Sequence, residues 1–275
     1  MTEQHRLPYD DFIAFAHGLA DASGEVIRPY FRAPLDVTNK AAAGFDPVTE
    51  ADKAAERVIA EAVAARWPDH GFVGEEYGTT RPEARLRWVV DPIDGTRAFI
   101  MGWPMWGTLI GLLDGATPVL GMMDQPFTRE RYWSAGTLSY MRVGDAAPKP
   151  IKTRACLTLS EAILSTTHPD LFENGTEAER FARLKSQVRM TRYGGDCYGY
   201  CLLAAGFADL VVEAGLKPFD IVALIPIIEN AGGRITTWDG KPATQGGRIV
   251  AAGDPRLHEQ AVKACLLYTS PSPRD

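Results

Sequence analysis

The sequence predicts a layered domain of mixed α and β structure, and three observations support this fold class. Several long segments carry apolar residues at helical spacing, whereas other segments are short apolar runs bounded by Gly, Asp and Pro. The two kinds of segment are mixed without a regular βαβ alternation, which favours packed layers over a doubly wound parallel sheet. The chain has 275 residues, of which 45% are hydrophobic, so it can bury a large core.

The first half is predicted to begin with two helices, at residues 10–32 and 49–67. Apolar residues recur along the first at mostly helical spacing, and the second has acids in its first turn and ends before Pro68. Short strands follow, and the turn residues between them favour antiparallel pairing. The expected strands span residues 71–76, 86–91, 106–115, 117–125 and 130–136.

The second half is predicted to mix both types of element. The expected strands span residues 161–167, 208–215, 233–240 and 248–254, and the expected helices span 176–188, 196–206, 219–233 and 255–266. Because no internal repeat or long linker interrupts the chain, we expect one domain over residues 1–267, with halves of about 1–145 and 146–267. The Ser- and Pro-rich residues 268–275 are expected to be a disordered tail or a non-native addition.

Charge and composition exclude several functional classes. The net charge is −6 and no basic cluster is present, so we expect no nucleic-acid partner. The N-terminus lacks the features of a signal peptide, and no apolar run approaches the ~20 residues of a membrane span, which predicts a cytoplasmic protein without a membrane partner. Cys197 and Cys201 lack a second Cys/His pair at metal spacing, so buried free thiols are expected rather than a zinc site.

The most informative stretch is "WVVDPIDGTRAF", in which an apolar run ends in two acids, Asp91 and Asp94. The proline between them favours an extended conformation at Asp91. The turn that follows can fold Asp94 back towards Asp91, with the Ile93 carbonyl between the two carboxylates. Three hard oxygen donors directed at one point suit Mg2+. An ordinary Asp-Gly turn accounts for the same spacing when it occurs alone.

The same stretch continues into a short helix-like segment that begins at Gly95 and Thr96. Backbone N–H groups at such a start can bind an anion. Metal ligands and a phosphate cradle therefore fall within six residues of each other.

Other acidic stretches strengthen this interpretation. Glu75 and Glu76 follow an apolar run, Asp220 stands at the start of an apolar helix, and "DPVTEAD" places Asp52 in a charged first helical turn. Each has a simpler explanation as a solvated turn, an N-cap or a helix start. Their joint occurrence is what favours a metal centre.

The stretches "DPVTEAD", "GEE", "DPIDGT" and the "FD" that opens a helix, in this order, resemble the inositol monophosphatase superfamily of Mg2+-dependent, lithium-sensitive phosphatases. The resemblance covers roughly residues 10–265 and is strongest to the histidinol-phosphate phosphatases. Arg97-Ala98 and Phe219 stand where inositol phosphatases more often carry Thr-Asn and a tryptophan. The resemblance implies an α+β fold, the layered αβαβα sandwich of the inositol monophosphatase and fructose bisphosphatase type, commonly assembled as a homodimer.

The resemblance also implies roles for individual residues. The implied ligands of two or three Mg2+ ions are Glu75, Asp91, the Ile93 carbonyl, Asp94 and Asp220. Asp52 and Thr96, hydrogen-bonded to each other, are implied to position the attacking water, and Glu75 is catalytic with them. The amides of Gly95 and Thr96 are implied to hold phosphate oxygens.

The expected reaction is the hydrolysis of the phosphomonoester L-histidinol phosphate to L-histidinol and phosphate, a step of histidine biosynthesis. Histidinol carries an ammonium group and an imidazole, so its pocket should offer acids. Glu213 matches a substrate-contacting position of the family, and Asp196 is a second candidate, for which a role as helix N-cap is equally expected. Arg97, Trp103 and Trp106 follow the metal loop and are candidates for the pocket wall, with core packing as the alternative for both tryptophans.

Three other functions are weighed against this one. An inositol-1-monophosphatase or a broad sugar-phosphate phosphatase shares the metal centre and differs only in the alcohol pocket. A non-catalytic regulatory relative would have lost a metal ligand, and none is lost. A nucleotide-binding protein is disfavoured because no phosphate-binding G-x-x-x-x-G-K-[ST] loop is present.

Overall fold

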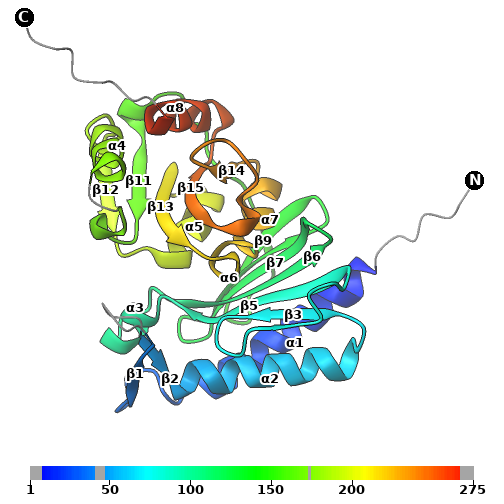
Figure 1. Ribbon diagram of the computed structural model, residues 1–275. Coiled ribbons are helices and arrows are strands. Elements are labelled where there is room, and N and C mark those ends of the chain that lie inside the picture. Colours follow the sequence, from blue (N-terminus) through cyan, green and yellow to red (C-terminus); the bar gives the residue numbers. More distant parts are fainter. Residues whose placement is uncertain (1–7, 41–46, 173–174, 267–275) are drawn as a thin grey trace, which may run out of the picture.

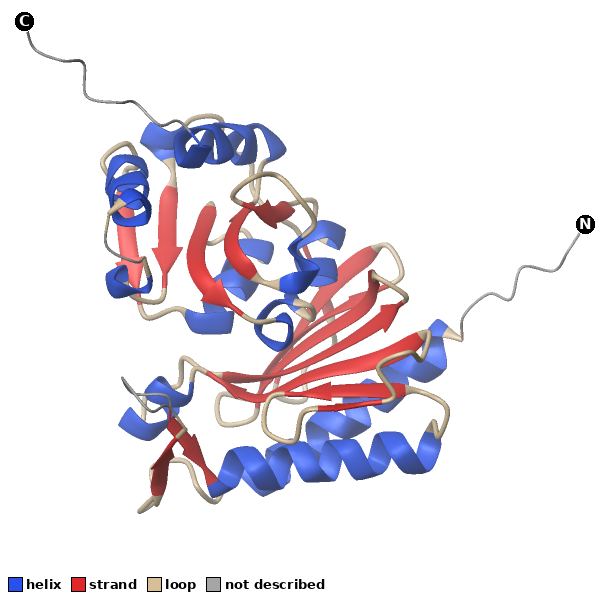
Figure 2. Ribbon diagram, in the orientation of Figure 1, coloured by secondary structure: helices blue, strands red, loops and turns tan. Residues whose placement is uncertain are grey.

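The computed structural model describes residues 8–40, 47–172 and 175–266, arranged in five alternating layers of helices and sheets (Figure 1). Two sheets are separated by one layer of helices, and each sheet is covered on its other face by a further layer (Figure 2). This is the predicted α+β sandwich with αβαβα layering. Residues 268–275, for which a tail or a non-native addition was predicted, lie outside the described residues.

The first outer layer consists of α1 (Tyr9–Ile27) and α2 (Glu50–Arg66), which pack together and cover one face of the larger sheet. The buried face of α1 includes Phe12 and Leu19. Thr49 is the N-cap of α2, and Asp52 completes a capping box by accepting a hydrogen bond from the Thr49 backbone.

The larger sheet has eight strands in the order β10-β9-β8-β7-β6-β5-β3-β4. Its strands are β3 (Gly71–Gly74), β4 (Thr79–Thr80), β5 (Leu86–Asp94), β6 (Gly107–Asp114), β7 (Thr117–Gln125), β8 (Glu130–Ala135), β9 (Leu138–Val143) and β10 (Lys149–Ile151). Antiparallel pairing is confirmed from β5 through β8. The prediction is wrong for β3, which runs parallel to β5. The chain turns back after β3 and forms the edge strand β4 before it enters β5 in the same direction as β3.

The smaller sheet has five strands in the order β12-β11-β13-β15-β14. Its strands are β11 (Ile163–Thr166), β12 (Met190–Tyr193), β13 (Leu210–Leu216), β14 (Arg234–Thr237) and β15 (Gly247–Ala252). Strand β11 lies parallel to both β12 and β13, whereas β15 is antiparallel to its two neighbours. A separate two-stranded pair, β1 (Val37–Asn39) and β2 (Pro47–Thr49), precedes α2.

The central layer consists of helices α5 (Asp196–Ala204), α6 (Pro218–Ile221) and α7 (Leu224–Asn230). The predicted helix 219–233 is therefore two short helices. The second outer layer contains α4 (Thr176–Lys185) and α8 (Pro255–Leu266), which pack on each other, and α8 lies against β15. The short α3 (Thr96–Met101) directly follows β5.

The largest apolar cluster lies where the central helices meet both sheets, and it includes Leu109, Val211 and Ile227. At Gly121 of β7 the sheet approaches α7 so closely that a Cβ atom would lie 1.8 Å from the Ala223 carbonyl oxygen. Among the described residues, no helix is long and apolar enough to cross a membrane.

Candidate active site

Strand β5 carries the acidic stretch into the centre of the molecule. Its register against β6 is regular as far as Asp91 and shifts between Asp91 and Asp94. In this irregular segment, the backbone N–H of Ile93 donates a hydrogen bond of 3.0 Å to Oδ1 of Asp91. The strand ends at Asp94, and the next residue, Gly95, has a φ of +85° and leaves no room for a Cβ atom, because that atom would lie 2.8 Å from the Met105 carbonyl oxygen.

Three of the predicted metal ligands form a tight group. Carboxylate oxygens of Asp91, Asp94 and Asp220 all lie within 4.8 Å of one another, although Asp220 comes from α6 in the second half of the chain. Two are fixed by backbone N–H groups: Cys197 donates to Oδ2 of Asp94 over 2.7 Å, and Lys217 donates to Oδ2 of Asp220 over 2.6 Å. The structure thus brings together acids that are distant in the sequence.

The cavity around these acids has a volume of about 520 Å³. Its lining includes further predicted site residues, namely Glu75, Ile93, Gly95 and Thr96. Glu75 is outside this group of three but interacts with Asp91, and it also pairs with Lys40, whose Nζ lies 2.9 Å from Glu75 Oε1 and 2.8 Å from Glu76 Oε1. Sequence reasoning missed Lys40, because a single lysine in a polar loop carries no signal of its own.

The negative charges of the aspartates repel one another, and a bound cation would offset this repulsion. Burial raises the pKa of Asp91, and the charges of Glu75, Asp94 and Asp220 raise it further. Burial also raises the pKa of Asp94, with added repulsion from Asp220, and raises the pKa of Asp220 to about 7. Hard oxygen donors whose negative charges repel one another in a partly buried cavity are a donor set that fits Mg2+.

The expected hydrogen bond between Thr96 and Asp52 is not formed. The Thr96 hydroxyl instead donates to the Ile93 carbonyl over 3.1 Å. Asp52 uses its Oδ2 atom to cap α2, accepting from the N–H and hydroxyl of Thr49 at 2.8 and 2.5 Å. Its Oδ1 atom is buried without a hydrogen-bond partner among the described residues, and burial raises the pKa of Asp52 to about 6.

A second, smaller cavity adjoins the first. It has a volume of about 120 Å³ and shares Asp94 and Asp220 with the larger cavity. The two acids predicted to contact the alcohol part of the substrate, Asp196 and Glu213, both line it. Asp196 comes from the start of α5 and Glu213 from β13.

Asp196 is not the N-cap of α5, so that alternative is wrong. The N-cap position is held by Gly195, and no side-chain capping bond is present. Asp196 has a φ of +42°, an uncommon conformation for a residue with a side chain, and its backbone N–H donates to Oγ1 of Thr167 over 3.1 Å. Burial raises the pKa of Asp196 to about 7, and the nearby charge of Glu213 contributes to this shift.

Glu213 is held by three internal hydrogen bonds. Its Oε1 atom accepts from the N–H of Thr167 at 2.8 Å and from its hydroxyl at 2.6 Å, and its Oε2 atom accepts from the Tyr200 hydroxyl at 3.1 Å. Burial raises the pKa of Glu213, although these hydrogen bonds act in the opposite direction. Glu213 therefore helps to shape the cavity and also contributes a carboxylate group to its lining.

Comparison with known proteins agrees with this geometry. Residues 9–268 match the model of the inositol monophosphatase family. The chain belongs to this family. It is 45% identical to the bifunctional phosphatase IMPL2 of Arabidopsis thaliana, a chloroplastic protein, over 93% of this chain and 75% of the relative. It is 34% identical to the histidinol-phosphatase of Mycobacterium tuberculosis, over 93% and 98% of the two chains.

Solved structures and further relatives point the same way. An inositol monophosphatase from Zymomonas mobilis superimposes with a TM-score of 0.84 at 43% identity, covering 95% of this chain and all of that chain. The inositol monophosphatase of Mesembryanthemum crystallinum is 32% identical over 94% of this chain and 97% of the relative. The resemblance inferred from the sequence motifs is thus confirmed, and this chain is a phosphoric monoester hydrolase of a metal-dependent family, typically active with Mg2+.

The structure of this inositol monophosphatase family member also places the three residues that were candidates for the pocket wall, Arg97, Trp103 and Trp106. Arg97 is exposed on α3 and lines neither cavity, although its charge acts to lower the pKa of Asp196. Trp106 is fully buried against Phe31 and Phe99, so it belongs to the core, whereas Trp103 is 51% exposed. All four cysteines are buried and free, including Cys197 and Cys201, for which buried free thiols were predicted.

Proposed function

We propose that the protein hydrolyses L-histidinol phosphate to L-histidinol and phosphate. The observation that carries the proposal is the second cavity, in which Asp196 and Glu213 stand beside the aspartates of the metal site. The phosphate end of any family substrate meets the shared metal centre, so the alcohol end must decide the specificity. An acidic cavity at that position suits a cationic alcohol.

The energetic difference between candidate substrates favours histidinol. A cationic group beside a carboxylate forms a charge-assisted hydrogen bond of roughly 1.5–3 kcal/mol, whereas a neutral hydroxyl gains less. A difference of about 1.4 kcal/mol corresponds to a tenfold preference. The ammonium and imidazole of histidinol can both use this gain, and the relatives at 34% identity that are named histidinol-phosphatase support the assignment.

In the proposed mechanism, Mg2+ would be held by Glu75, Asp91, the Ile93 carbonyl, Asp94 and Asp220. Bound there, it would supply a Lewis acid for the phosphoryl oxygens and would acidify the attacking water. Gly95 and Thr96 line the cavity, and the chain itself would offer their backbone N–H groups to phosphate oxygens. The buried Oδ1 of Asp52 is an acceptor without a donor, and we assign it to the Thr96 hydroxyl in the substrate-bound state.

The second candidate function is the hydrolysis of inositol 1-phosphate. Relatives named inositol monophosphatase match almost the whole chain. Inositol presents only hydroxyl groups, which can donate to carboxylates without charge assistance. This candidate therefore predicts little dependence on the charge of Asp196.

The deciding experiment compares kcat/KM for the two substrates at saturating Mg2+. Asp196→Asn is the cleaner variant, because Glu213→Gln would also direct an amide at the donors Thr167 and Tyr200. We expect at least tenfold higher kcat/KM for histidinol phosphate, and a loss of roughly tenfold in that preference in Asp196→Asn. Asp170→Asn is the control, since Asp170 is an exposed acid that lines neither cavity. Equal efficiency on both substrates would overturn the assignment.

We also propose a homodimer in the cytoplasm, on the basis of the family resemblance and the sequence. Light scattering after size exclusion measures the mass in solution directly. A mass corresponding to the monomer would reject the dimer.

A further inference from the structure

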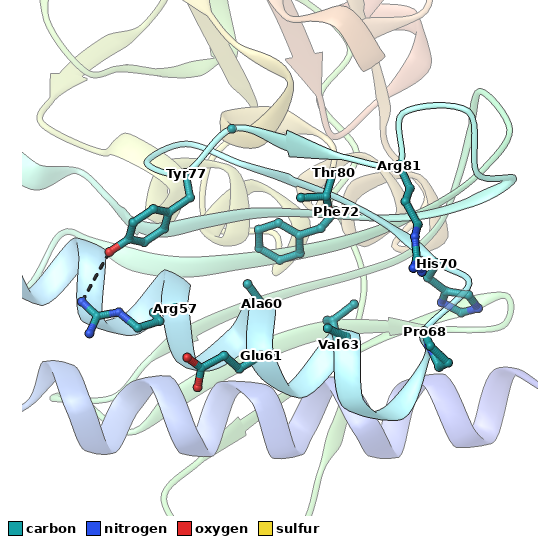
Figure 3. A pocket seen from close by; sticks show the side chains of 12 residues that line it. Arg57, Ala60, Glu61, Val63, Pro68, His70, Phe72, Tyr77, Thr80 and Arg81 are labelled. Carbon is teal, nitrogen blue, oxygen red and sulfur yellow. Dashed lines mark hydrogen bonds between the residues drawn. The ribbon is translucent and has the colours of Figure 1, made fainter.

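A larger pocket, separate from the active site, lies between α2 and the β3–β4 hairpin (Figure 3). Its volume is about 550 Å³, and it shares no lining residue with either active-site cavity. The middle of the pocket is apolar, with Ala60, Val63 and Ala64 from α2 and Phe72 from β3. Such a surface suits an apolar body of small-molecule size.

One end of the pocket presents an arginine that has no side-chain partner among the described residues. Arg81 follows β4 and has a φ of +48°, an uncommon conformation for a residue with a side chain. Its side chain extends from the hairpin towards His70 (Figure 3). Within the described parts of the chain, Arg81 forms no side-chain hydrogen bond or ion pair.

His70 adds a second donor at the same end. The indole Nε1 of Trp88, which can only donate, forms a hydrogen bond of 3.1 Å to Nδ1 of His70. Burial lowers the pKa of His70, although the charge of Asp69 acts in the opposite direction, so the ring is neutral at pH 7 and carries its proton on Nε2. The ring is fixed by stacking on Trp67, with an interplanar angle of 4°.

At the other end of the pocket, the positive charge of Arg57 is offset by the negative charge of Glu61. Arg57 approaches the Tyr77 hydroxyl at 3.4 Å (Figure 3), and Glu61 stands one turn further along α2, where its charge acts on Arg57. The excess positive charge is therefore located at Arg81.

We propose that this pocket binds a small monoanion with an apolar body, such as an aromatic carboxylate, with the anionic group at Arg81 and His70. Two donors at one end and an apolar middle complement such a ligand in both charge and polarity. A neutral apolar molecule would leave the Arg81 end unused, and a polyanion would find no second cationic cluster.

The pocket is connected to the active site through the turn that follows β3. The N–H groups of Glu76 and Tyr77 both donate to the Glu56 carboxylate of α2 over 2.8 Å. Tyr77 lines this pocket, while Glu75, two residues earlier, lines the active-site cavity. A ligand that moves Tyr77 relative to α2 therefore acts on Glu75, and we expect it to change the affinity for Mg2+. This last step rests on the proposed role of Glu75 as a metal ligand.

The binding site is tested with anilinonaphthalene sulfonate, a fluorescent aromatic monoanion, added to the full chain. We expect saturable binding of one probe per chain and its displacement by 3-phenylpropionate. Ala64→Phe should abolish binding by filling the pocket, whereas Ala65→Phe, a control on the adjacent exposed position of α2, should not. Arg81→Gln should weaken binding roughly tenfold and Arg57→Gln much less.

Each outcome bears on a separate part of the proposal. Probe binding that is unchanged in both Ala64→Phe and Arg81→Gln would overturn the site, and a larger effect of Arg57→Gln would overturn the orientation. The coupling is measured by calorimetric Mg2+ titration with and without the probe. An Mg2+ affinity that the bound probe leaves unchanged would overturn the coupling, whereas absence of Mg2+ binding in both titrations would reject the metal site itself.

Discussion

The backbone N–H of Cys197 donates a hydrogen bond of 2.7 Å to Oδ2 of Asp94, 103 residues earlier in the chain. This contact joins the last residue of β5 to the start of α5, and so links the two halves of the molecule. It orients Asp94 within the group of aspartates and places the adjacent Asp196 in the second cavity. This contact thus connects the metal site with the proposed specificity pocket.

Asp94→Asn should lower kcat by roughly 100-fold or more, because it removes charge from a proposed ligand and alters the bond with Cys197. Calorimetry should show weakened Mg2+ binding, and circular dichroism should show an intact fold. Asp114→Asn is the control, since Asp114 pairs with Arg85 at the surface and lies outside the cavity. Turnover near the wild-type value at saturating Mg2+ would remove Asp94 from the site.

Thr96→Ala should lower kcat by roughly tenfold or more and change KM little, because orientation of the attacking water matters mainly in the transition state. Thr96→Ser keeps the hydroxyl and should retain most of the activity. Steady-state kinetics on both variants separate the two parameters. A loss confined to KM would show that Thr96 serves substrate binding instead.

The local parts of the site could be predicted from the sequence. An apolar run, a proline and an Asp-Gly pair define the end of β5 within a few residues, so Asp91 and Asp94 were found from their immediate neighbours. Asp220 lies far away along the chain and gained its role only from the combined family motif. The sequence leaves the roles of Trp103 and Trp106 open, because an aromatic side chain is expected equally in a protein core and in the wall of a pocket.

Other features depend on contacts that no short segment encodes. The left-handed conformation of Asp196 accompanies its bond to Thr167, and the Thr96 hydroxyl donates to the Ile93 carbonyl while Oδ2 of Asp52 caps α2. Strand β12 has mainly exposed residues and pairs only with β11, so its sequence lacks the alternation that reveals a half-buried strand.

The Mg2+ affinity should respond in opposite directions to two changes around Glu75. Lys40→Gln removes the cation that pairs with Glu75, so it should raise the Mg2+ affinity several-fold. Glu76→Gln leaves Lys40 paired with Glu75 alone and removes a nearby negative charge, so it should lower the affinity by a similar factor. Calorimetric titrations measure both constants, with Glu83→Gln as an exposed control. Shifts of the same sign would reject Lys40 as a competitor of the metal.

The thermal stability of the metal-free protein should fall as the pH rises from about 4 to 7. The folded state raises the pKa of Asp220 from 3.8 to about 7, so it favours the protonated carboxyl, and this contribution is lost as the pH rises through 7. Asp91 and Asp94 shift in the same direction. Melting curves in EDTA and in Mg2+ should therefore diverge with pH, and Asp220→Asn should reduce the divergence. Parallel curves would mean that the acids are not coupled to folding.

Gly121→Ala tests the contact between the larger sheet and the central helices. The new methyl group would lie 1.8 Å from the carbonyl oxygen of Ala223, so β7 and α7 must separate or distort. We expect a cost of about 1–3 kcal/mol and a clear drop in the melting temperature. Gly18→Ala is the matched control, because Gly18 lies within α1 with open space around it, and there alanine should stabilise the helix by about 0.5–1 kcal/mol. If both variants gain stability, the two layers do not meet at Gly121 as closely as the structure shows, and the placement of Asp220, which α6 carries just before α7, would need revision with it.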